Sequence, residues 1–514
     1  MKAFLMHADR DFDVEQEFPP GEQALAQDLE LNTLLGVMAA GDGFLFDVAR
    51  EAVLCGLQDP EAIAYRQQVL RDCLEQASVV REIYDIAVEA IHGERQSWRP
   101  LAQYPSGILH WSGEVLQLFV GMLKRLRGVA DSHAGEFRSE GFTRFFAMIS
   151  KELGDDYFAA VQDHLKRLKF RDGVLVSAKL GAGNVGTGYV LRKSRASRRG
   201  LTGLAPAGQR SGYSFTISDR DENGARALSS LSGRGINLVA NALAQSTDHI
   251  LSFFRLLRAE LAFYIGCLNL HEQLAGQGEP TCFPVPLPQA EAAFSARGLY
   301  DPCLALTTGT GVVGNDVSAD VKPLVVITGA NQGGKSTFLR AVGLAQLMMQ
   351  AGMFAAGTSL RASVCSGLFT HYKREEDATM TSGKLDEELS RMSGIAAAIR
   401  PGGILLCNES FASTNEREGS EIARQIVRAL LGAGVRVFLV THLHDLAKGF
   451  HREPAGTAVF LRAERQPGGR RTFRLSEGEP LPTSHGKDVY DRVFGTPASA
   501  TAGGEPSPPV APEP

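Results

Sequence analysis

The sequence has no apolar stretch long enough to cross a membrane, since a spanning helix needs about 18 consecutive apolar residues. Its first apolar run, residues 3–6, is too short for the core of a signal peptide. Cysteine is sparse, with seven residues in a chain of 514 and no pair spaced C-x-x-C. A disulfide framework and a zinc site therefore have no support, and reduced thiols in a cytoplasmic protein without a membrane partner are the simplest interpretation.

A strong excess of one charge is also missing. The chain has 53 Lys and Arg residues against 58 Asp and Glu residues, a net charge of −5, which excludes a uniformly basic, histone-like protein. Residues 173–218 nevertheless contain no acidic residue. The basic residues of this segment are Lys179, Arg192, Lys193, Arg195, Arg198, Arg199 and Arg210. We expect them to contact the phosphate backbone of DNA, with a solvated charged face as the alternative.

Residue spacing predicts a helical region before this segment and a shorter one after it. From about residue 22 to 170, apolar residues recur at intervals of three and four, and Asp59-Pro60 is typical of a helix start. Helical spacing returns from about residue 225 to 277. Strands alternate with helices from about residue 294 to 449, which indicates an α/β domain.

The basic segment itself is rich in glycine and serine and is β-like at residues 174–176, 189–191 and 213–217. Its residues 181–186, GAGNVG, fit G-x-G-x-x-G, the pattern of a dinucleotide-binding turn. No helix pattern follows, and no acidic residue stands about 20 residues later, so a hairpin turn is the better interpretation. The resulting domain prediction is a helical region at 1–171, a basic β-rich insert at 172–220, a returning helical region at 221–290, an α/β domain at 291–495 and a disordered tail at 496–514.

A phosphate-binding loop is the most specific motif. The apolar strand at residues 324–328 runs into GANQGGKST at 329–337, which fits G-x-x-x-x-G-K-[ST] and is followed by an apolar helix. Backbone amides of such a loop and the following helix N-terminus bind phosphate. Lys335 is expected to reach the β- and γ-phosphates of ATP, and Ser336 to ligate Mg²⁺. The predicted nucleotide-binding residues of the loop are Gly329, Ala330, Asn331, Gln332, Gly333, Gly334, Lys335, Ser336 and Thr337.

Two further strands end in polar residues. The strand at residues 403–407 leads into Asn408 and Glu409. P-loop ATPases often have Asp-Glu here, with the Asp helping to hold Mg²⁺ and the Glu activating water. We expect Asn408 to be a weaker magnesium ligand and Glu409 to be the general base, with a structural pair after the strand as the alternative. The strand at 435–440 ends in Thr441-His442, and His442 is placed to sense a γ-phosphate.

These residues resemble the MutS family of DNA mismatch-repair ATPases. GANQGGKST is similar to that family's GPNMGGKST, with Ala330 and Gln332 as departures. Asn408-Glu409 stands where the family has Asp-Glu, and Thr441-His442 matches its T-H. Ser382-Gly383 resembles the family's signature loop, which completes the nucleotide site of the partner subunit.

The weaker parts of the resemblance concern the base and the rest of the chain. Gly314-Asn315-Asp316 resembles a family segment beside the adenine, so Asn315 is a further expected nucleotide contact, but Val312 stands where an aromatic is usual. The helical region resembles the family's core and lever domains, and the basic insert stands where the family has its DNA clamp. We find no Phe-x-Glu motif in the context of a mismatch-recognition domain, so we expect a MutS-like protein without that domain.

The resemblance implies an α/β P-loop ATPase domain of the ABC type, preceded by a mainly helical core/lever region with a small β insert. It implies a slow, Mg²⁺-dependent ATPase that acts on DNA in mismatch repair or recombination, as a homodimer joined through its ATPase domains. Glu409, Lys335 and His442 are the expected catalytic residues, and Ser336 and Asn408 the expected metal ligands. The alternatives are a nucleotide-switched binding scaffold with little hydrolysis, which Asn408 favours, and a P-loop kinase.

Overall fold

The computed structural model describes residues 1–97, 104–170, 173–193, 214–218, 220–374, 383–453, 456–466 and 470–480. The chain divides into two compact units. The first unit comprises Met1–Pro19, Asn32–Gly278 and Leu347–Phe354. The second unit comprises Pro20–Leu31, Glu279–Gln346 and Ala355–Pro514. Both units are therefore assembled from segments that are distant in the sequence.

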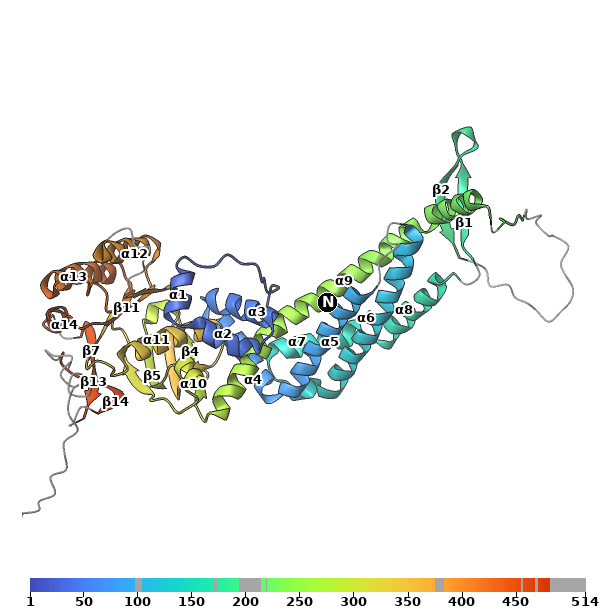
Figure 1. The fold of residues 1–514 in the computed structure, drawn as a ribbon. Helices are drawn as coiled ribbons and strands as arrows, with labels where there is room; N and C mark the ends of the chain where they lie inside the picture. Colours follow the sequence, from blue (N-terminus) through green and yellow to red (C-terminus); the bar gives the residue numbers. More distant parts are fainter. Residues whose placement is uncertain are drawn as a thin grey trace, which may run out of the picture. The chain divides into compact units, whose positions relative to one another are not determined.

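The first unit is mainly helical. Its elements are α2 (Leu31–Ala39), α3 (Gly43–Leu54), α4 (Pro60–Glu75), α5 (Ala77–Gln96), α6 (Pro105–His133), a 3-10 turn η1 (Ala134–Glu136), α7 (Glu140–Glu152), α8 (Asp155–Leu168), β1 (Leu175–Leu180), a 3-10 turn η2 (Ala182–Asn184), β2 (Gly186–Arg192) and α9 (Glu222–Gly276). The long α9 runs beside α5 and α6 (Figure 1). Its C-terminal half is buried among them, as at Phe254, Leu261 and Phe263. Burial of these apolar side chains stabilises the bundle.

Local signals explain where helices begin. The Asp59 carboxylate accepts a hydrogen bond from the amide of Glu61 at 3.1 Å, and Pro60 occupies the first turn of α4. Both features favour a helix start, as the sequence predicts. Asp221 caps α9 in the same way through the amide of Gly224 at 2.8 Å.

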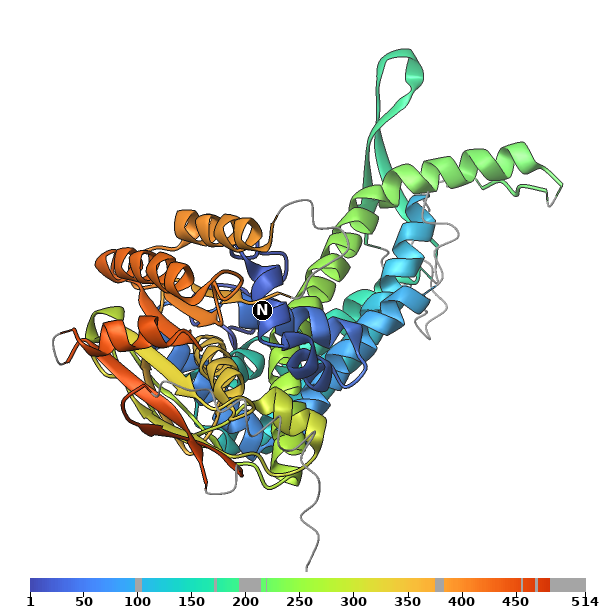
Figure 2. The same cartoon turned by 60° about the vertical axis from the view of Figure 1, so that its left-hand side comes forward.

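Strands β1 and β2 form an antiparallel hairpin, with Val176 opposite Leu191. The G-x-G-x-x-G segment makes its turn, where Gly183 has φ 66°, so the predicted hairpin turn is confirmed. The hairpin packs closely on α9, because a Cβ on Gly235 would lie 2.4 Å from Cγ2 of Val176. Figure 2 shows the hairpin standing out from the side of α9.

The third β-like segment is a wrong prediction as far as the structure describes it, because residues 214–218 form no strand. Phe215 is 81% exposed, so the alternating apolar residues here have no buried face to stabilise a strand. The four basic residues expected beyond the hairpin and the predicted tail lie outside the described residues: Arg195, Arg198, Arg199, Arg210 and residues 496–514.

The N-terminal segment is held inside the first unit by buried polar groups of α9. The Glu260 carboxylate accepts hydrogen bonds from the amides of Leu5 at 2.6 Å and Met6 at 3.3 Å. The Tyr264 hydroxyl donates to the carbonyl of Leu5 at 2.6 Å. Glu260 is fully buried, and this burial raises the pKa of its carboxyl to about 7.

The second unit is α/β. Its elements are α1 (Glu22–Asp28), β3 (Thr281–Cys282), β4 (Val285–Leu287), a 3-10 turn η3 (Gln289–Glu291), β5 (Phe294–Leu299), α10 (Pro302–Thr308), β6 (Asn315–Ser318), β7 (Leu324–Gly329), α11 (Lys335–Gln350), β8 (Ala355–Ala356), β9 (Ser359–Ser363), β10 (Leu368–Tyr372), α12 (Lys384–Ala398), β11 (Ile404–Asn408), α13 (Glu416–Gly432), β12 (Arg436–Val440), α14 (His444–His451), β13 (Ala458–Arg465) and β14 (Arg471–Glu477). Helix α11 crosses the boundary between the two units.

The main sheet has the strand order β10-β11-β12-β7-β13-β14. All neighbours are parallel except β13 and β14, which pair antiparallel. A smaller sheet has the order β4-β9-β5-β6, and β3 pairs with β8. Side chains of β11 and β12, such as Leu405 and Leu439, pack against α12, α13 and α14 through Met392, Val427 and Phe450. This core fixes the strand ends that carry the polar residues.

The structure contains no helix with the length and apolar character of a membrane span among the residues it describes.

Candidate functional site

The phosphate-binding loop connects β7 to α11. Its shape depends on glycine, because Gly329 has φ 108° and Gly334 has φ 88°. A Cβ on Gly333 would lie 2.8 Å from Cβ of Ala463 on β13 and 2.9 Å from the carbonyl oxygen of Ala330. The loop is therefore folded tightly against the neighbouring strand at the start of α11.

Lys335 is the first residue of α11, and its side chain is buried beneath this loop. Its Nζ donates hydrogen bonds to the carbonyl oxygens of Gly329 at 3.1 Å and Ala330 at 2.9 Å. Burial lowers the pKa of Lys335 to about 8, with Glu409 opposing this shift and Arg471 adding to it. The ammonium group is thus held at the loop, where an anion would stabilise its charge.

Ser336 and Asn408 meet across the sheet edge. The Ser336 hydroxyl donates a hydrogen bond to Oδ1 of Asn408 at 3.0 Å. The two residues expected to ligate a cation therefore place two oxygen atoms side by side, the ligand type that Mg²⁺ prefers. Among the described residues, no group of three or more His, Cys, Asp or Glu side chains forms a metal site.

Glu409 and His442 form a second pair beside the first. Nε2 of His442 lies 2.8 Å from Oε1 of Glu409, and both side chains are about 30% exposed. The hydrogen bond from His442 lowers the pKa of the Glu409 carboxyl and outweighs the effect of burial. Glu409 is therefore an ionised, partly accessible carboxylate, as a general base has to be.

Parallel register explains why these residues converge. Asn408 on β11 is paired with Val440 on β12, and Val440 is paired with Ile327 on β7. The carboxyl ends of the three strands therefore lie at one edge of the sheet. The amide of Glu409 also donates to the carbonyl of Val440 at 2.9 Å, which ties the two polar strand ends together.

A cavity of about 420 Å³ opens beside the phosphate-binding loop. Its walls come from α10, the segment before β6, the loop, the first turn of α11 and β14, and they include Leu304, Val312, Gln332, Thr337 and Phe473. The volume falls in the range of small-molecule sites, and the lining combines apolar and polar side chains. The exposed ring of Phe473 gives this cavity an aromatic wall.

Asn315 lines the same cavity, but its side chain is committed to neighbouring backbone. Its Nδ2 donates to the carbonyl of Phe473 at 3.1 Å, and its Oδ1 accepts from the amide of Leu475 at 2.7 Å. The structure therefore places Asn315 where it fastens β6 to β14. Through these bonds it holds Phe473 at the cavity.

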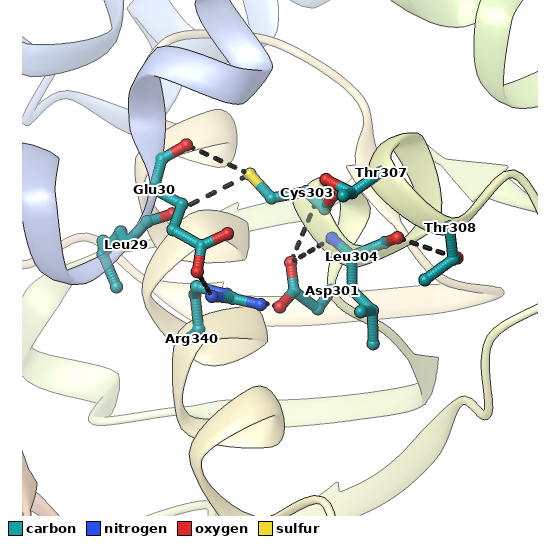
Figure 3. Close-up of polar contacts among 8 residues, drawn as sticks. All are labelled: Leu29, Glu30, Asp301, Cys303, Leu304, Thr307, Thr308 and Arg340. Carbon is teal, nitrogen blue, oxygen red and sulfur yellow. Dashed lines mark hydrogen bonds and ion pairs between the residues drawn. The ribbon is translucent and has the colours of Figure 1, made fainter.

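The α10 wall is fixed by an ion-pair cluster (Figure 3). Asp301 is fully buried, caps α10 through the amide of Cys303 at 2.9 Å and pairs with Arg340 of α11. Arg340 also pairs with Glu30, which follows α1. The Cys303 thiol lies 3.5 Å from the carbonyl oxygen of Glu30. The N-terminal segment of the second unit thus helps to hold the cavity wall against α11.

The remaining expected residues are less fully placed. Gly383 is exposed and is the N-cap residue of α12, whereas Ser382 lies outside the described residues. Lys179, Arg192 and Lys193 are exposed on or directly after the β1–β2 hairpin. Arg192 donates a hydrogen bond to the Ser177 hydroxyl at 2.8 Å. The structure therefore brings three of the seven basic residues together on one hairpin.

Two residues of β14 are not anticipated by the sequence analysis. Arg471 donates to the carbonyl of Asn331 in the phosphate-binding loop at 3.0 Å, and Phe473 lines the cavity. Neither residue belongs to a short motif. Only the alternation of polar and apolar residues in a final hairpin could have indicated them.

Two family models match the chain in separate regions. Residues 58–277 match the MutS2 N-terminal domain, and residues 325–499 match MutS domain V. Together the two matches span most of the chain.

Individual relatives agree with these matches. A "DNA mismatch repair protein MutS" of Methanosarcina mazei is 27% identical over 220 residues, which is 40% of this chain and 24% of the relative. A "Probable DNA mismatch repair protein Msh6" of Drosophila melanogaster is 30% identical over 185 residues, 35% of this chain and 15% of the relative. An "Endonuclease MutS2" of Anaeromyxobacter sp. is 31% identical over 201 residues, 37% of this chain and 24% of the relative.

The alignments span only a quarter or less of the length of these relatives. The names of these relatives agree with the two matched family models. The match to MutS domain V, residues 325–499, contains the phosphate-binding loop, Asn408-Glu409 and Thr441-His442. On these grounds the chain belongs to the MutS family.

Proposed function

We propose that this chain is a MutS-like ATPase that acts on DNA in mismatch repair or recombination. One observation carries the proposal. Lys335, the Ser336–Asn408 pair and the Glu409–His442 pair converge at the carboxyl ends of the parallel strands β7, β11 and β12. This set provides a phosphate-binding cation, a candidate cation site and an ionised base within one small region.

ATP is the proposed substrate. The amides of GANQGGKST and the Lys335 ammonium bind its phosphates. The base occupies the cavity of about 420 Å³, against the ring of Phe473. Phe473 of β14 then supplies an aromatic surface in place of the aromatic residue that the family usually has at the position of Val312.

Mg²⁺ fits the oxygen donors at this edge. Ser336 and Asn408 would hold it, and it would neutralise part of the phosphate charge. Asn408 contributes an oxygen atom without a formal charge, so we expect weaker magnesium binding than with an aspartate at this position.

Glu409 prepares the water that attacks. Its carboxylate takes a proton as the water oxygen forms a bond to the γ-phosphorus. The bond between that phosphorus and the oxygen bridging to the β-phosphorus breaks, and ADP and inorganic phosphate are the products. Lys335 stabilises the charge that develops on the leaving oxygen. His442 holds the Glu409 carboxylate through the 2.8 Å contact between its Nε2 and Oε1 of Glu409. It would lie between this carboxylate and the γ-phosphate.

A homodimer joined through the ATPase domains would complete the site. ATP bound at Lys335 would also meet the signature loop of the other subunit, where Ser382 and Gly383 stand in this sequence. In that dimer the helical levers would move with the state of the bound nucleotide. The β1–β2 hairpin would contact the phosphates of DNA.

The alternative is a nucleotide-switched scaffold that hydrolyses little ATP and does not bind DNA. Its support is Asn408, which lacks the charge of the usual aspartate. A P-loop kinase has less support, because Ser382-Gly383 and Thr441-His442 resemble the MutS motifs and the helical region is large.

The test is steady-state ATP hydrolysis with and without duplex, mismatched and branched DNA at two salt concentrations. We expect DNA to stimulate hydrolysis and added salt to weaken the stimulation, because phosphate contacts release counterions. The DNA that stimulates most identifies the preferred substrate. Hydrolysis that is indifferent to all three DNAs would contradict the DNA role and favour the scaffold.

A further inference from the structure

The turn that carries Glu409 is strained. Glu409 has φ 56° and Phe411 has φ 62°, both in the left-handed region that side-chain-bearing residues rarely adopt. Such a conformation is unfavourable for a residue with a side chain, and it persists only where surrounding contacts impose it. Ser410 stands between the two strained residues. The contacts of Ser410 and Phe411 therefore decide where the Glu409 carboxylate lies.

His371 makes those contacts. It is fully buried on β10, and its Nδ1 lies 2.7 Å from the Ser410 hydroxyl. Its ring is stacked on that of Phe411, with centroids 5.4 Å apart and an interplanar angle of 22°. One side chain thus holds both residues that follow Glu409.

The protonation of His371 is consistent with this role. Its Nε2 lies 3.0 Å from the carbonyl oxygen of Glu388, which can only accept a hydrogen bond. Nε2 therefore carries the proton, and Nδ1 of the neutral ring is an acceptor. The Ser410 hydroxyl lies within reach of two acceptors, Nδ1 at 2.7 Å and the backbone carbonyl oxygen of His371 at 2.9 Å. Burial lowers the pKa of His371 to about 4, and the nearby Arg391 and Arg374 act in the same direction, so the ring is neutral at pH 7.

A second contact fixes the far end of the turn. The Ser413 hydroxyl donates to Oε1 of Glu388 at 3.0 Å, and Glu388 is fully buried on α12. The backbone oxygen of Glu388 faces His371, and its side chain faces Ser413. Residues 410–413 are therefore held to β10 and α12 at two points.

We propose that His371 is a positioning residue for Glu409. It acts through Ser410 and Phe411 and keeps the carboxylate facing His442 and close to Lys335. The inference rests on the proposed function, since it concerns the base of the proposed hydrolysis. His371 touches neither nucleotide nor water in this role, so its loss reduces the rate of the chemical step and leaves nucleotide binding nearly unchanged.

The test compares ATP hydrolysis by the wild type, Ser410→Ala, His371→Phe and the double variant. Ser410→Ala removes one oxygen atom, and His371→Phe keeps a ring against Phe411 but removes both hydrogen bonds. The matched control is Ser420→Ala on α13, because Ser420 is also buried and its hydroxyl has no hydrogen-bond partner within the described residues.

We expect His371→Phe and Ser410→Ala each to lower kcat about tenfold with KM within about twofold, and the double variant to be no slower than the slower single variant. Ser420→Ala should change neither kcat nor KM.

The inference is overturned if His371→Phe matches Ser420→Ala in kcat, or if only KM changes. If the wild type hydrolyses ATP in those cases, the proposed function is retained and only the role of His371 is rejected. A wild type that hydrolyses no ATP overturns the proposed function and this inference together.

Discussion

Asn408 occupies the position where a charge would matter most to a bound cation. Its Oδ1 accepts from the Ser336 hydroxyl at 3.0 Å, and a carboxylate oxygen can accept the same hydrogen bond. Asn408→Asp therefore adds a negative charge without removing the contact. We expect the Mg²⁺ concentration for half-maximal ATP hydrolysis to fall several-fold, because attraction between opposite charges increases at short range.

The control for this prediction is Asn415→Asp, which adds the same charge at the N-cap of α13. ATP hydrolysis by the wild type, Asn408→Asp and Asn415→Asp is measured at increasing Mg²⁺ concentrations. Equal magnesium dependence in Asn408→Asp and Asn415→Asp would show that Asn408 does not face the cation.

Lys335 should make nucleotide binding depend on pH. Its pKa is lowered to about 8, so the side chain is charged below pH 8 and neutral above it. A bound phosphate stabilises the charged form, so binding above pH 8 requires uptake of a proton. We expect the Kd for ATP to be nearly constant from pH 6.5 to 7.5 and to rise by up to about tenfold per pH unit above pH 8. A Kd that stays flat to pH 9.5 would contradict the role of Lys335.

At the scale of elements, the phosphate-binding loop depends on its contact with β13. Gly333→Ala would place a methyl group 2.8 Å from Cβ of Ala463 and 2.9 Å from the carbonyl oxygen of Ala330. The loop would have to move, so we expect ATP affinity to fall at least tenfold while the fold persists. Gly394→Ala on α12 is the control, because its Cβ would meet nothing within 4 Å. The affinities of Gly333→Ala and Gly394→Ala are compared by equilibrium binding of a fluorescent ATP analogue. Equal affinities would show that the loop tolerates the methyl group.

The β1–β2 hairpin should carry part of the DNA affinity. Replacing Lys179, Arg192 and Lys193 together with Ala removes three exposed positive charges. We expect weaker binding and a smaller slope of log affinity against log salt, by up to about 0.9 for each DNA phosphate that the variant no longer neutralises. A second triple variant, with Ala at the exposed Arg95, Lys151 and Arg452, removes the same charge elsewhere. Indistinguishable salt slopes in the two variants would refute a DNA contact at the hairpin.

The elements also show why some of the structure could be predicted and some could not. The phosphate-binding loop, Asn408-Glu409 and Thr441-His442 each follow a strand directly, so short motifs identify them, and parallel pairing brings them together. Phe473, Arg471 and His371 act through contacts between segments distant in sequence, and no local pattern indicates them. Tyr213–Ile217 illustrates the opposite error, since its alternation predicts a strand that residues 214–218 do not form.

At the scale of the whole molecule, the chain passes repeatedly between its two units. Pro20–Leu31 belongs to the second unit although it precedes most of the first, and its Asp28 pairs with Arg374 after β10 at 3.0 Å. Helical periodicity correctly predicted a helix here, but periodicity carries no information about which unit a helix packs against. That choice depends on tertiary contacts such as those of Glu30 and Asp28.

The helical unit should lose stability as pH rises, because of Glu260. Its pKa is raised from 4.5 to about 7, so the folded state binds a proton more tightly than the unfolded state. The resulting loss in the free energy of unfolding is absent below pH 4.5 and grows as the pH rises through 7, reaching roughly 3 kcal/mol. Glu260→Gln should flatten this dependence, and Asp248→Asn, an exposed change on the same helix, should not. The free energy of unfolding of the wild type and the two variants is measured with denaturant at pH 5.5, 7 and 8.5. The same change with pH in all three proteins would show that Glu260 does not cause it.

Glu409 is the proposed general base that activates water for ATP hydrolysis at the edge of the sheet. Its role is tested by measuring ATP binding and hydrolysis by the wild type and Glu409→Gln, side by side at saturating Mg²⁺. We expect both proteins to bind ATP with similar affinity, and the variant to hydrolyse it at least a hundredfold more slowly, because general-base catalysis contributes about 10²- to 10⁴-fold. Equal hydrolysis rates in the two proteins would contradict the role of Glu409 as the base.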